Sequence, residues 1–258
     1  MRLIFIRHAE PDYENNTLTE RGFREAELLA ERVPNWTVER FYSSPLKRAL
    51  LTAEPSMKKM NRSLETLDWM KEFSYAIHDP TTGRRQIPWD FMPQYWTNEP
   101  LLLDRNDFWQ HPILQSAQGY EPAVHALRKG MDALLAEFGY FRQDNYYYTD
   151  DARTMGDDDR TVVIFAHLGA NCEAMGYLLG ISPVVLKQTI YLAPTSVSIL
   201  NADKRQPGAP EGWNPARPDS GFPGIAAFRA QVIGDATHLL DAGQPISPSG
   251  AFSEIFSG

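Results

Sequence analysis

The sequence has very little cysteine and no long apolar run. Cys172 is the only cysteine among 258 residues, so no disulfide can form within the chain. The apolar run Leu3 to Ile6 lies between two arginines and is too short for a signal peptide, and no stretch reaches transmembrane length. We therefore expect a cytoplasmic protein that does not associate with membranes.

Runs of basic residues are also absent. The chain carries 25 Lys and Arg against 33 Asp and Glu, which gives a net charge of −8. A nucleic-acid-binding surface needs concentrated positive charge, so we expect no nucleic-acid partner. An anionic substrate would have to be bound by a local basic pocket.

The order of predicted elements favours an α/β fold. Apolar, β-branched stretches predict strands, and patterns of helical period alternate with them. With 43% hydrophobic residues, the chain is long enough for one domain, 1–258, with a sizeable core. We expect a three-layer sandwich, in which a mostly parallel central sheet has helices on both faces. The strands are expected near 2–6, 40–43, 161–166 and 195–200, and the helices near 20–33, 45–60, 121–138 and 171–179.

Three stretches interrupt this alternation. Residues 74–118 contain Trp89, Trp96 and Trp109 without a sustained period; such aromatics more often form a small core of their own than a ligand cage. Residues 144–160, with Tyr146 to Tyr148, are expected to be a solvated connection. Residues 204–224, rich in Pro and Gly, are expected to join two neighbouring strands.

Two histidines follow predicted strands at the point where each strand ends. Arg7-His8 ends the first apolar run, and His167 ends the run Val162 to Ala166. In an open α/β sheet, functional sites form at the carboxyl ends of the strands. Taken alone, the first pair could lie in a surface loop and His167 could be a hydrogen-bonded core residue.

Two further segments lead into helices. Leu18-Thr19-Glu20-Arg21-Gly22 opens a helix with Thr19 as its N-cap. Ser43-Ser44-Pro45-Leu46-Lys47-Arg48-Ala49 follows a strand, with a serine cap, Pro45 near the first helical turn and Arg48 one turn into the helix.

Together, these segments resemble the histidine phosphatase superfamily, in its phosphoglycerate-mutase-like branch. The match continues with Pro194-Thr195-Ser196-Val197-Ser198 and Gly234-Asp235-x-x-His238-Leu239. Two departures from the family pattern are present: Ala9 stands where a glycine is usual, and Ala166-His167-Leu168-Gly169 replaces the usual Gly-His-Gly. Both change the freedom of the backbone and the room beside the pocket but remove no chemical group. The resemblance implies a lid inserted at about residues 74–120.

The resemblance also implies the roles of the site residues. Neutral His8 would attack phosphorus and form a phosphohistidine. The guanidiniums of Arg7 and Arg48 would bind the phosphate, and His167 would donate to its oxygens. Glu72, in the segment Leu67 to Phe73, would be the general acid that protonates the leaving group, with Glu65 and Asp68 as alternatives.

Several other residues are candidates for substrate binding or for supporting roles. Arg84 and Arg85 could bind an anionic tail of the substrate or form a solvated turn. Asn171 or the backbone after His167 is expected to add a donor at a helix start, and Ser43 to orient His8. His238 is expected to be structural. We expect neither a metal nor another cofactor.

These residues give three hypotheses. The first is a histidine acid phosphatase-like enzyme that hydrolyses a small phosphorylated metabolite through phospho-His8. The second is a phosphomutase of the phosphoglycerate type, which needs a closed, strongly basic pocket that excludes water. The third is a catalytically inactive module that binds a phosphorylated ligand. A homodimer is compatible with each of them.

Overall fold

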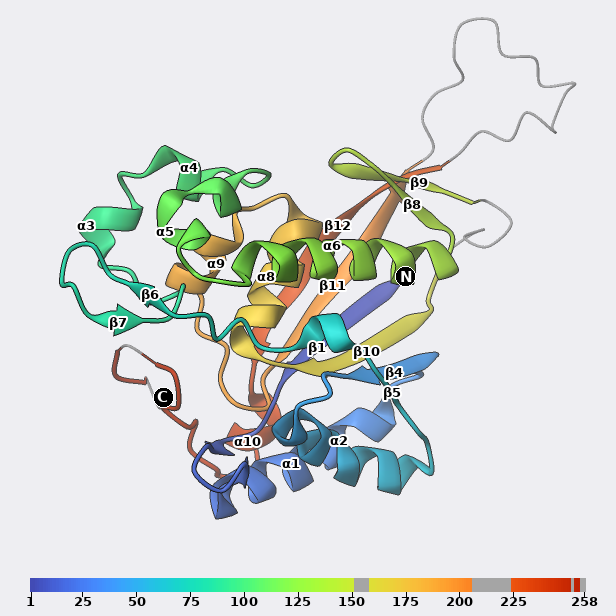
Figure 1. Ribbon diagram of the computed structural model, residues 1–258. Coiled ribbons are helices and arrows are strands. Elements are labelled where there is room, and N and C mark those ends of the chain that lie inside the picture. The colour runs from blue at the N-terminus through green and yellow to red at the C-terminus, as the bar shows by residue number, and fades with distance from the viewer. Residues whose placement is uncertain (151–157, 206–223, 252, 256–258) are drawn as a thin grey trace, which may run out of the picture.

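The computed structural model describes residues 1–150, 158–205, 224–251 and 253–255 (Figure 1). The strands are β1 (Arg2–Arg7), β2 (Pro11–Asp12), β3 (Thr17–Leu18), β4 (Arg40–Ser43), β5 (Glu65–Thr66), β6 (Ile77–His78), β7 (Arg85–Gln86), β8 (Tyr140–Gln143), β9 (Tyr146–Thr149), β10 (Thr161–Ala166), β11 (Val197–Arg205) and β12 (Gly224–Asp235). The helices are α1 (Glu20–Arg32), α2 (Lys47–Met60), α3 (Pro93–Trp96), α4 (Pro100–Leu103), α5 (Pro112–Gln115), α6 (Tyr120–Glu137), α8 (Leu168–Leu179), α9 (Pro183–Thr189) and α10 (Thr237–Leu240). Short 3-10 turns are η1 (Val33–Asn35), η2 (Asp68–Met70) and η3 (Phe108–Gln110).

Eight strands form one mixed sheet in the order β5-β4-β10-β1-β11-β12-β9-β8. The pairs from β5 to β1 are parallel, and the pairs from β1 to β8 are antiparallel. The parallel strands therefore lie at the centre and at one side of the sheet. This arrangement confirms the predicted α/β class, and it adds an antiparallel half at the other side.

Helices cover both faces of the sheet, as predicted. Along β1, Leu3 and Phe5 belong to the core cluster that includes side chains of α6 and α8, whereas Ile4 and Ile6 belong to the cluster with α1 and α2. Successive side chains of a strand point to opposite faces, so a strand covered on both faces needs apolar residues throughout. Figure 1 shows the two helical layers on either side of the sheet.

The predicted helix starts need small corrections. The helix after His167 begins at Leu168 rather than near Asn171. Helix α2 begins at Lys47, and Leu46 is its N-cap without a side-chain hydrogen bond. The Ser44 hydroxyl accepts a hydrogen bond from Leu46 N at 3.3 Å, but Ser44 lies two residues before the N-cap and does not cap the helix.

The expected solvated connection at 144–160 is wrong for Tyr146 to Tyr148. These residues belong to β9, which pairs with β8 and β12. Tyr147 is buried against the ring of Phe228, at a centroid distance of 5.4 Å, while Tyr148 faces outward. Three adjacent tyrosines thus follow the alternation of a strand, and the burial of one ring stabilises the edge of the sheet. Residues 151–157 lie outside the described part of the chain.

The stretch 204–224 connects β11 to β12, and these strands are antiparallel neighbours as predicted. Residues 206–223 are outside the described residues. Among the helices of the described ranges, none is both long enough and apolar enough to cross a bilayer.

The segment 74–118 carries the β6–β7 hairpin and the helices α3 to α5. Its buried aromatics, Trp89, Phe91 and Phe108, belong to the same core cluster as the sheet and α6, and Trp96 and Trp109 pack against that cluster. The aromatics therefore serve packing, as expected, but they extend the main core instead of forming a separate one.

A buried ion pair joins the helices on this face of the sheet. Lys187 Nζ of α9 lies 2.6 Å from Glu173 Oε2 of α8, and it also donates to Tyr120 OH of α6 at 3.1 Å. Both charged side chains are fully buried, so each depends on the other to offset the loss of hydration.

A close approach of Gly22 fixes α1 against the chain that follows His8. Thr19 is the N-cap of α1, as predicted, and its hydroxyl accepts from Gly22 N. A Cβ atom at Gly22 would lie 2.2 Å from the carbonyl oxygen of Glu10. The spacing Thr19-x-x-Gly22 therefore combines a cap with a helix position that has no room for a side chain.

This contact makes Gly22→Ala destabilising, although alanine favours helices. Because the Glu10 backbone must move away, we expect a loss of ~1–3 kcal/mol in the free energy of unfolding. Urea denaturation measures it. Arg24→Ala, at an exposed position of the same helix, is the matched control and should change stability by less than ~0.5 kcal/mol. Equal stability of the two variants would contradict the steric argument.

Candidate active site

The pairing of β1 with β10 brings the two predicted histidines together. Arg7 is in register with Ala166, and His8 N donates to the carbonyl of Ala166 at 2.9 Å. The rings of His8 and His167 lie with their centroids 5.1 Å apart. Residues separated by more than 150 positions therefore form one site at the carboxyl ends of neighbouring parallel strands.

Strand β4, on the other side of β10, contributes a third group. Ser44 directly follows β4, and its N–H donates to the carbonyl of Phe165 at 2.8 Å. The Ser44 hydroxyl lies 2.7 Å from Nε2 of His167. Arg48 follows in the first turn of α2.

His8 is oriented by its own chain. Its Nδ1 lies 2.7 Å from the carbonyl oxygen of Ala9, and a carbonyl can only accept, so Nδ1 carries the proton and Nε2 has a free electron pair. The side chain is buried, and burial lowers the pKa of His8 well below its ordinary value, with further lowering by Arg7 and Arg48. His8 is thus a neutral base in a cationic setting.

The two predicted phosphate-binding arginines both have unused donors. Arg7 Nη1 donates to the carbonyl of Leu192 at 2.5 Å. The Nε atoms of Arg7 and Arg48 are buried and have no hydrogen-bond partner among the described residues. Burial lowers the pKa of Arg7, which nonetheless stays charged at neutral pH. Two guanidiniums with free N–H groups beside a neutral imidazole favour the binding of an oxyanion.

His167 has one engaged and one free ring nitrogen. Nε2 contacts Ser44, whereas Nδ1 is buried without a partner in the described part of the chain. Burial lowers the pKa of His167 well below its ordinary value, and the adjacent His8, Arg48 and Arg7 lower it further. His167 is therefore neutral before any anion binds.

Glu72 lies next to His167, at the N-terminus of α8. Its carboxylate accepts from Ala170 N at 3.0 Å, from Gly169 N at 3.3 Å and from Phe73 N at 2.9 Å. A negative charge is favourable at this end of a helix. The carboxylate is thereby fixed against the first turn of the helix that follows β10 and His167.

The two alternative acids face the surface. Glu65 pairs with Arg40 at 3.4 Å, and Asp68 pairs with Lys71 at 3.0 Å. Their side chains are 67% and 84% exposed, respectively. Of the three candidate acids, Glu72 is the one that contacts the helix following His167.

The remaining candidates differ in position. Arg84 and Arg85 are exposed at the β6–β7 hairpin. Asn171 is buried inside α8, with Oδ1 unpartnered among the described residues. Ser43 does not orient His8: its hydroxyl donates to the carbonyl of Ser44. The sequence interpretation missed Ser44, although it directly follows a strand, as His8 and His167 do.

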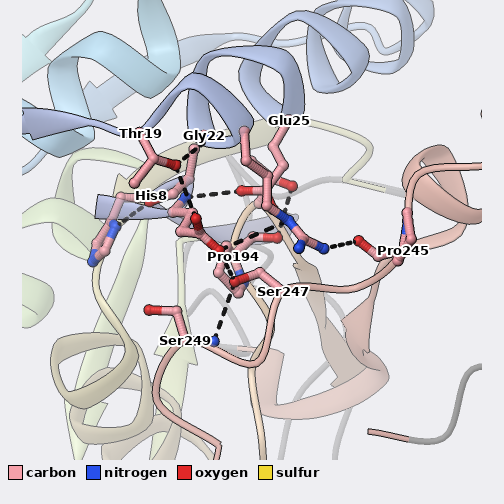
Figure 2. A network of polar contacts seen from close by, with 12 residues as sticks. His8, Thr19, Gly22, Glu25, Pro194, Pro245, Ser247 and Ser249 are labelled. Carbon is pink, nitrogen blue, oxygen red and sulfur yellow. Dashed lines mark hydrogen bonds and ion pairs between the residues drawn. The ribbon is translucent and has the colours of Figure 1, made fainter. Parts of the chain in front are cut away.

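A polar network holds the chain after His8 (Figure 2). Glu10 N donates to Glu25 Oε2 at 2.8 Å, and Arg21 pairs with Glu25. Ser247 Oγ donates to the Glu10 carboxylate, which ties the C-terminal segment to the same loop. This segment reaches the site itself, since a Cβ at Gly250 would lie 3.1 Å from Arg7 Nη2.

His238 contacts a turn that is hydrogen-bonded to the backbone of Arg7. Its Nε2 lies 3.1 Å from Thr195 Oγ1, and Thr195 N donates to the carbonyl of Arg7 at 3.1 Å. Thr195 adopts a left-handed backbone conformation with φ of 58°. Such a conformation is costly for threonine and is maintained by the surrounding contacts. His238 contacts this strained turn rather than the reacting groups.

The described residues contain no group of three or more His, Cys, Asp and Glu side chains that could hold a metal ion.

Residues 3–101 match the family model of the histidine phosphatase superfamily (branch 1). This match confirms the predicted resemblance to that superfamily.

Two curated proteins resemble parts of the chain. Over 73 residues the chain is 38% identical to the 2,3-bisphosphoglycerate-dependent phosphoglycerate mutase of Thermoplasma acidophilum, and the aligned stretch covers 24% of this chain and 36% of that protein. Over 116 residues the chain is 30% identical to phosphoserine phosphatase 1 of Hydrogenobacter thermophilus, and the aligned stretch covers 40% of this chain and 54% of that protein. The chain thus spans about a third to a half of the length of these curated relatives.

Solved structures extend the likeness of fold to most of the chain. A mutant phosphoserine phosphatase of Entamoeba histolytica with bound phosphoserine has a TM-score of 0.54 at 17% identity, covering 92% of this chain and 98% of that one. A mycobacterial glucosyl-3-phosphoglycerate phosphatase with inorganic phosphate has the same TM-score, identity and coverage. The likeness of fold to these two structures therefore includes the segments beyond residue 101.

The environment of the two histidines predicts their titration. Because burial and the neighbouring cations lower the pKa values of His8 and His167, both should stay neutral as the pH falls through 6.5 and become protonated only well below it. NMR titration of the ring signals measures this. Arg48→Gln removes one cation and should raise the midpoint of His8. A midpoint at or above 6.5 in the unaltered protein would contradict the electrostatic argument.

Proposed function

We propose that this chain is a metal-independent phosphomonoester hydrolase whose nucleophile is Nε2 of His8. The observation that carries the proposal is the orientation of this ring. Its Nδ1 is engaged by the carbonyl of Ala9, so the free electron pair of Nε2 lies beside two guanidiniums. Phosphoryl transfer asks a protein mainly for positioning and for cationic stabilisation of the phosphoryl oxygens, and this site offers both.

The reaction has two displacements. In the first, His8 Nε2 forms a bond to phosphorus, the ester P–O bond breaks, and the leaving alkoxide takes the proton of Glu72. In the second, water attacks phosphorus, loses a proton to the Glu72 carboxylate, and the P–N bond breaks. Arg7 and Arg48 bind the phosphoryl oxygens throughout, with His167 as a further donor. One difficult displacement is thereby divided into two easier ones.

Residues 74–120 are proposed as the lid over this site. The support comes from Gly169, next to His167. A Cβ at this position would lie 2.6 Å from Glu72 Oε1 and 2.8 Å from the Trp89 ring. Trp89 therefore lies against the same residue as the proposed acid, and it links the lid segment to the reacting groups. The glycine is required by this close approach.

The proposed substrate is a small phosphorylated metabolite, of the kind that carries a carboxylate near the phosphate. Two similar proteins are named for phosphoserine and for glucosyl-3-phosphoglycerate, and one for phosphoglycerate mutation. Hydrolysis is favoured over mutation because the lid arginines Arg84 and Arg85 are exposed. They do not contribute to a closed basic pocket of the kind a mutase needs.

The first test measures phosphate release from an aryl phosphate, phosphoserine, 3-phosphoglycerate and glucosyl-3-phosphoglycerate, with chelator present. We expect His8→Ala to lower turnover by at least ~10³-fold, since the variant lacks the proposed nucleophile. His125→Ala, at an exposed histidine of α6, is the control. Substantial turnover by His8→Ala would contradict the covalent mechanism. Isomerised phosphoglycerate without phosphate release would indicate a mutase, and neither product would indicate a binding module.

The second test separates the acid from the nucleophile. Glu72→Gln removes the transferable proton, so alkyl phosphates should react ~10²–10⁴-fold more slowly, while an aryl phosphate, which has a good leaving group, loses much less. Glu65→Gln is the control, because this carboxylate is exposed and paired with Arg40. Equal losses for alkyl and aryl substrates would remove Glu72 from the acid role.

A further inference from the structure

The proposed mechanism leaves open how a neutral His167 can donate to a phosphoryl oxygen. A neutral imidazole carries one proton, on either Nδ1 or Nε2. Here the surroundings of the two atoms differ. Nε2 lies 2.7 Å from Ser44 Oγ, and Nδ1 is buried without a partner in the described ranges. The position of that single proton decides which ring atom can contact an anion as a donor.

The contacts of Ser44 indicate the direction of its hydrogen bond. Ser44 is fully buried, and its Oγ accepts from Leu46 N at 3.3 Å. The hydroxyl has one proton and no other acceptor for it among the described residues, so donation to His167 Nε2 satisfies that proton, whereas a bond from Nε2–H would leave it buried without a partner. If Nε2 carried the proton instead, Nδ1 would present an electron pair, which repels the oxygens of a phosphoryl group.

We propose that Ser44 is a positioning residue that holds His167 in the tautomer protonated at Nδ1, so that the neutral ring donates from Nδ1 to a phosphoryl oxygen. The inference rests on the proposed function for its purpose, but the tautomer is a property of the resting protein. Its advantage follows from the charges around the ring. Arg7 and Arg48 already make the site cationic, and a fixed neutral donor adds a hydrogen bond without a third buried positive charge.

The chain supplies a matched control in the adjacent serine. Ser43 is also fully buried, but its hydroxyl donates to the carbonyl of Ser44 and not to a histidine ring. Ser43→Ala and Ser44→Ala therefore delete the same group at the same depth. A general loss of packing would affect both variants, whereas loss of tautomer control would affect Ser44→Ala alone.

The first experiment reads the tautomer directly, by ¹⁵N NMR of the histidine rings at neutral pH. The signals of His167 are assigned by their absence in His167→Gln. We expect Nδ1 to be protonated and Nε2 unprotonated in the unaltered protein and in Ser43→Ala, and a mixture of tautomers in Ser44→Ala. A proton on Nε2 in the unaltered protein, or an unchanged tautomer in Ser44→Ala, overturns the proposal.

The second experiment asks which ring position serves the reaction. The side-chain amide nitrogen of asparagine can replace Nδ1, and that of glutamine can replace Nε2. We therefore expect His167→Asn to retain ~10-fold more turnover of aryl phosphate than His167→Gln, and Ser44→Ala to lose ~10-fold in kcat with little change in Ser43→Ala. Greater turnover by His167→Gln, or equal losses in the two serine variants, contradicts the assignment.

The two experiments also separate this inference from the proposed function. If the unaltered protein hydrolyses none of the phosphomonoesters, the proposed function fails, and the NMR result alone decides the tautomer. If it hydrolyses them while Ser44→Ala keeps both its tautomer and its kcat, the proposed function is supported and the inference about Ser44 is wrong.

Discussion

The parallel alignment of β4, β10 and β1 is the constraint on which the rest of the site depends. Parallel strands end at the same edge of a sheet, so the residues that follow them become neighbours whatever their distance along the chain. Ser44, His167 and His8 each directly follow one of these strands. Backbone hydrogen bonds from Ser44 N to Phe165 O and from His8 N to Ala166 O extend the pairing one residue beyond the strands. The imidazoles are thereby fixed by the sheet itself.

Burial gives this edge its chemical character. The two histidines and Arg7 are almost inaccessible to solvent, so their charges act on one another with little screening. Burial, and after it the neighbouring cations, lower the pKa values of both imidazoles and keep them neutral, and neutral imidazoles permit two arginines to remain close by. The positive charge and the unused Nε–H groups of Arg7 and Arg48 favour an incoming oxyanion. The same surroundings thus favour both a neutral imidazole and a bound anion.

Glycine and helix termini complete the arrangement by allowing close contacts. Gly22 lets α1 approach the backbone after His8, and Gly169 leaves room for the Glu72 carboxylate and the Trp89 ring beside His167. The N–H groups at the start of α8 orient that carboxylate. The C-terminal segment reaches Arg7 through Gly250 and is held by Ser247. Segments from the N-terminal, central and C-terminal parts of the chain therefore meet around His8, His167 and Arg7.

The sequence by itself determined the central elements and pointed to the two histidines at the ends of their strands. Continuous apolar runs mark strands that are covered on both faces, and their ends located His8 and His167. It did not reveal β9, because three adjacent tyrosines show no alternation until the sheet buries Tyr147 and exposes Tyr148. It named Glu72 but left Glu65 and Asp68 as alternatives, and it named Ser43 where the structure places Ser44 against a histidine ring. The three acids are close in sequence, as are the two serines, and residues of one chemical type cannot be told apart from the sequence. The direction of each side chain is decided by strand register and by packing against α8, and both depend on contacts between residues far apart in the chain.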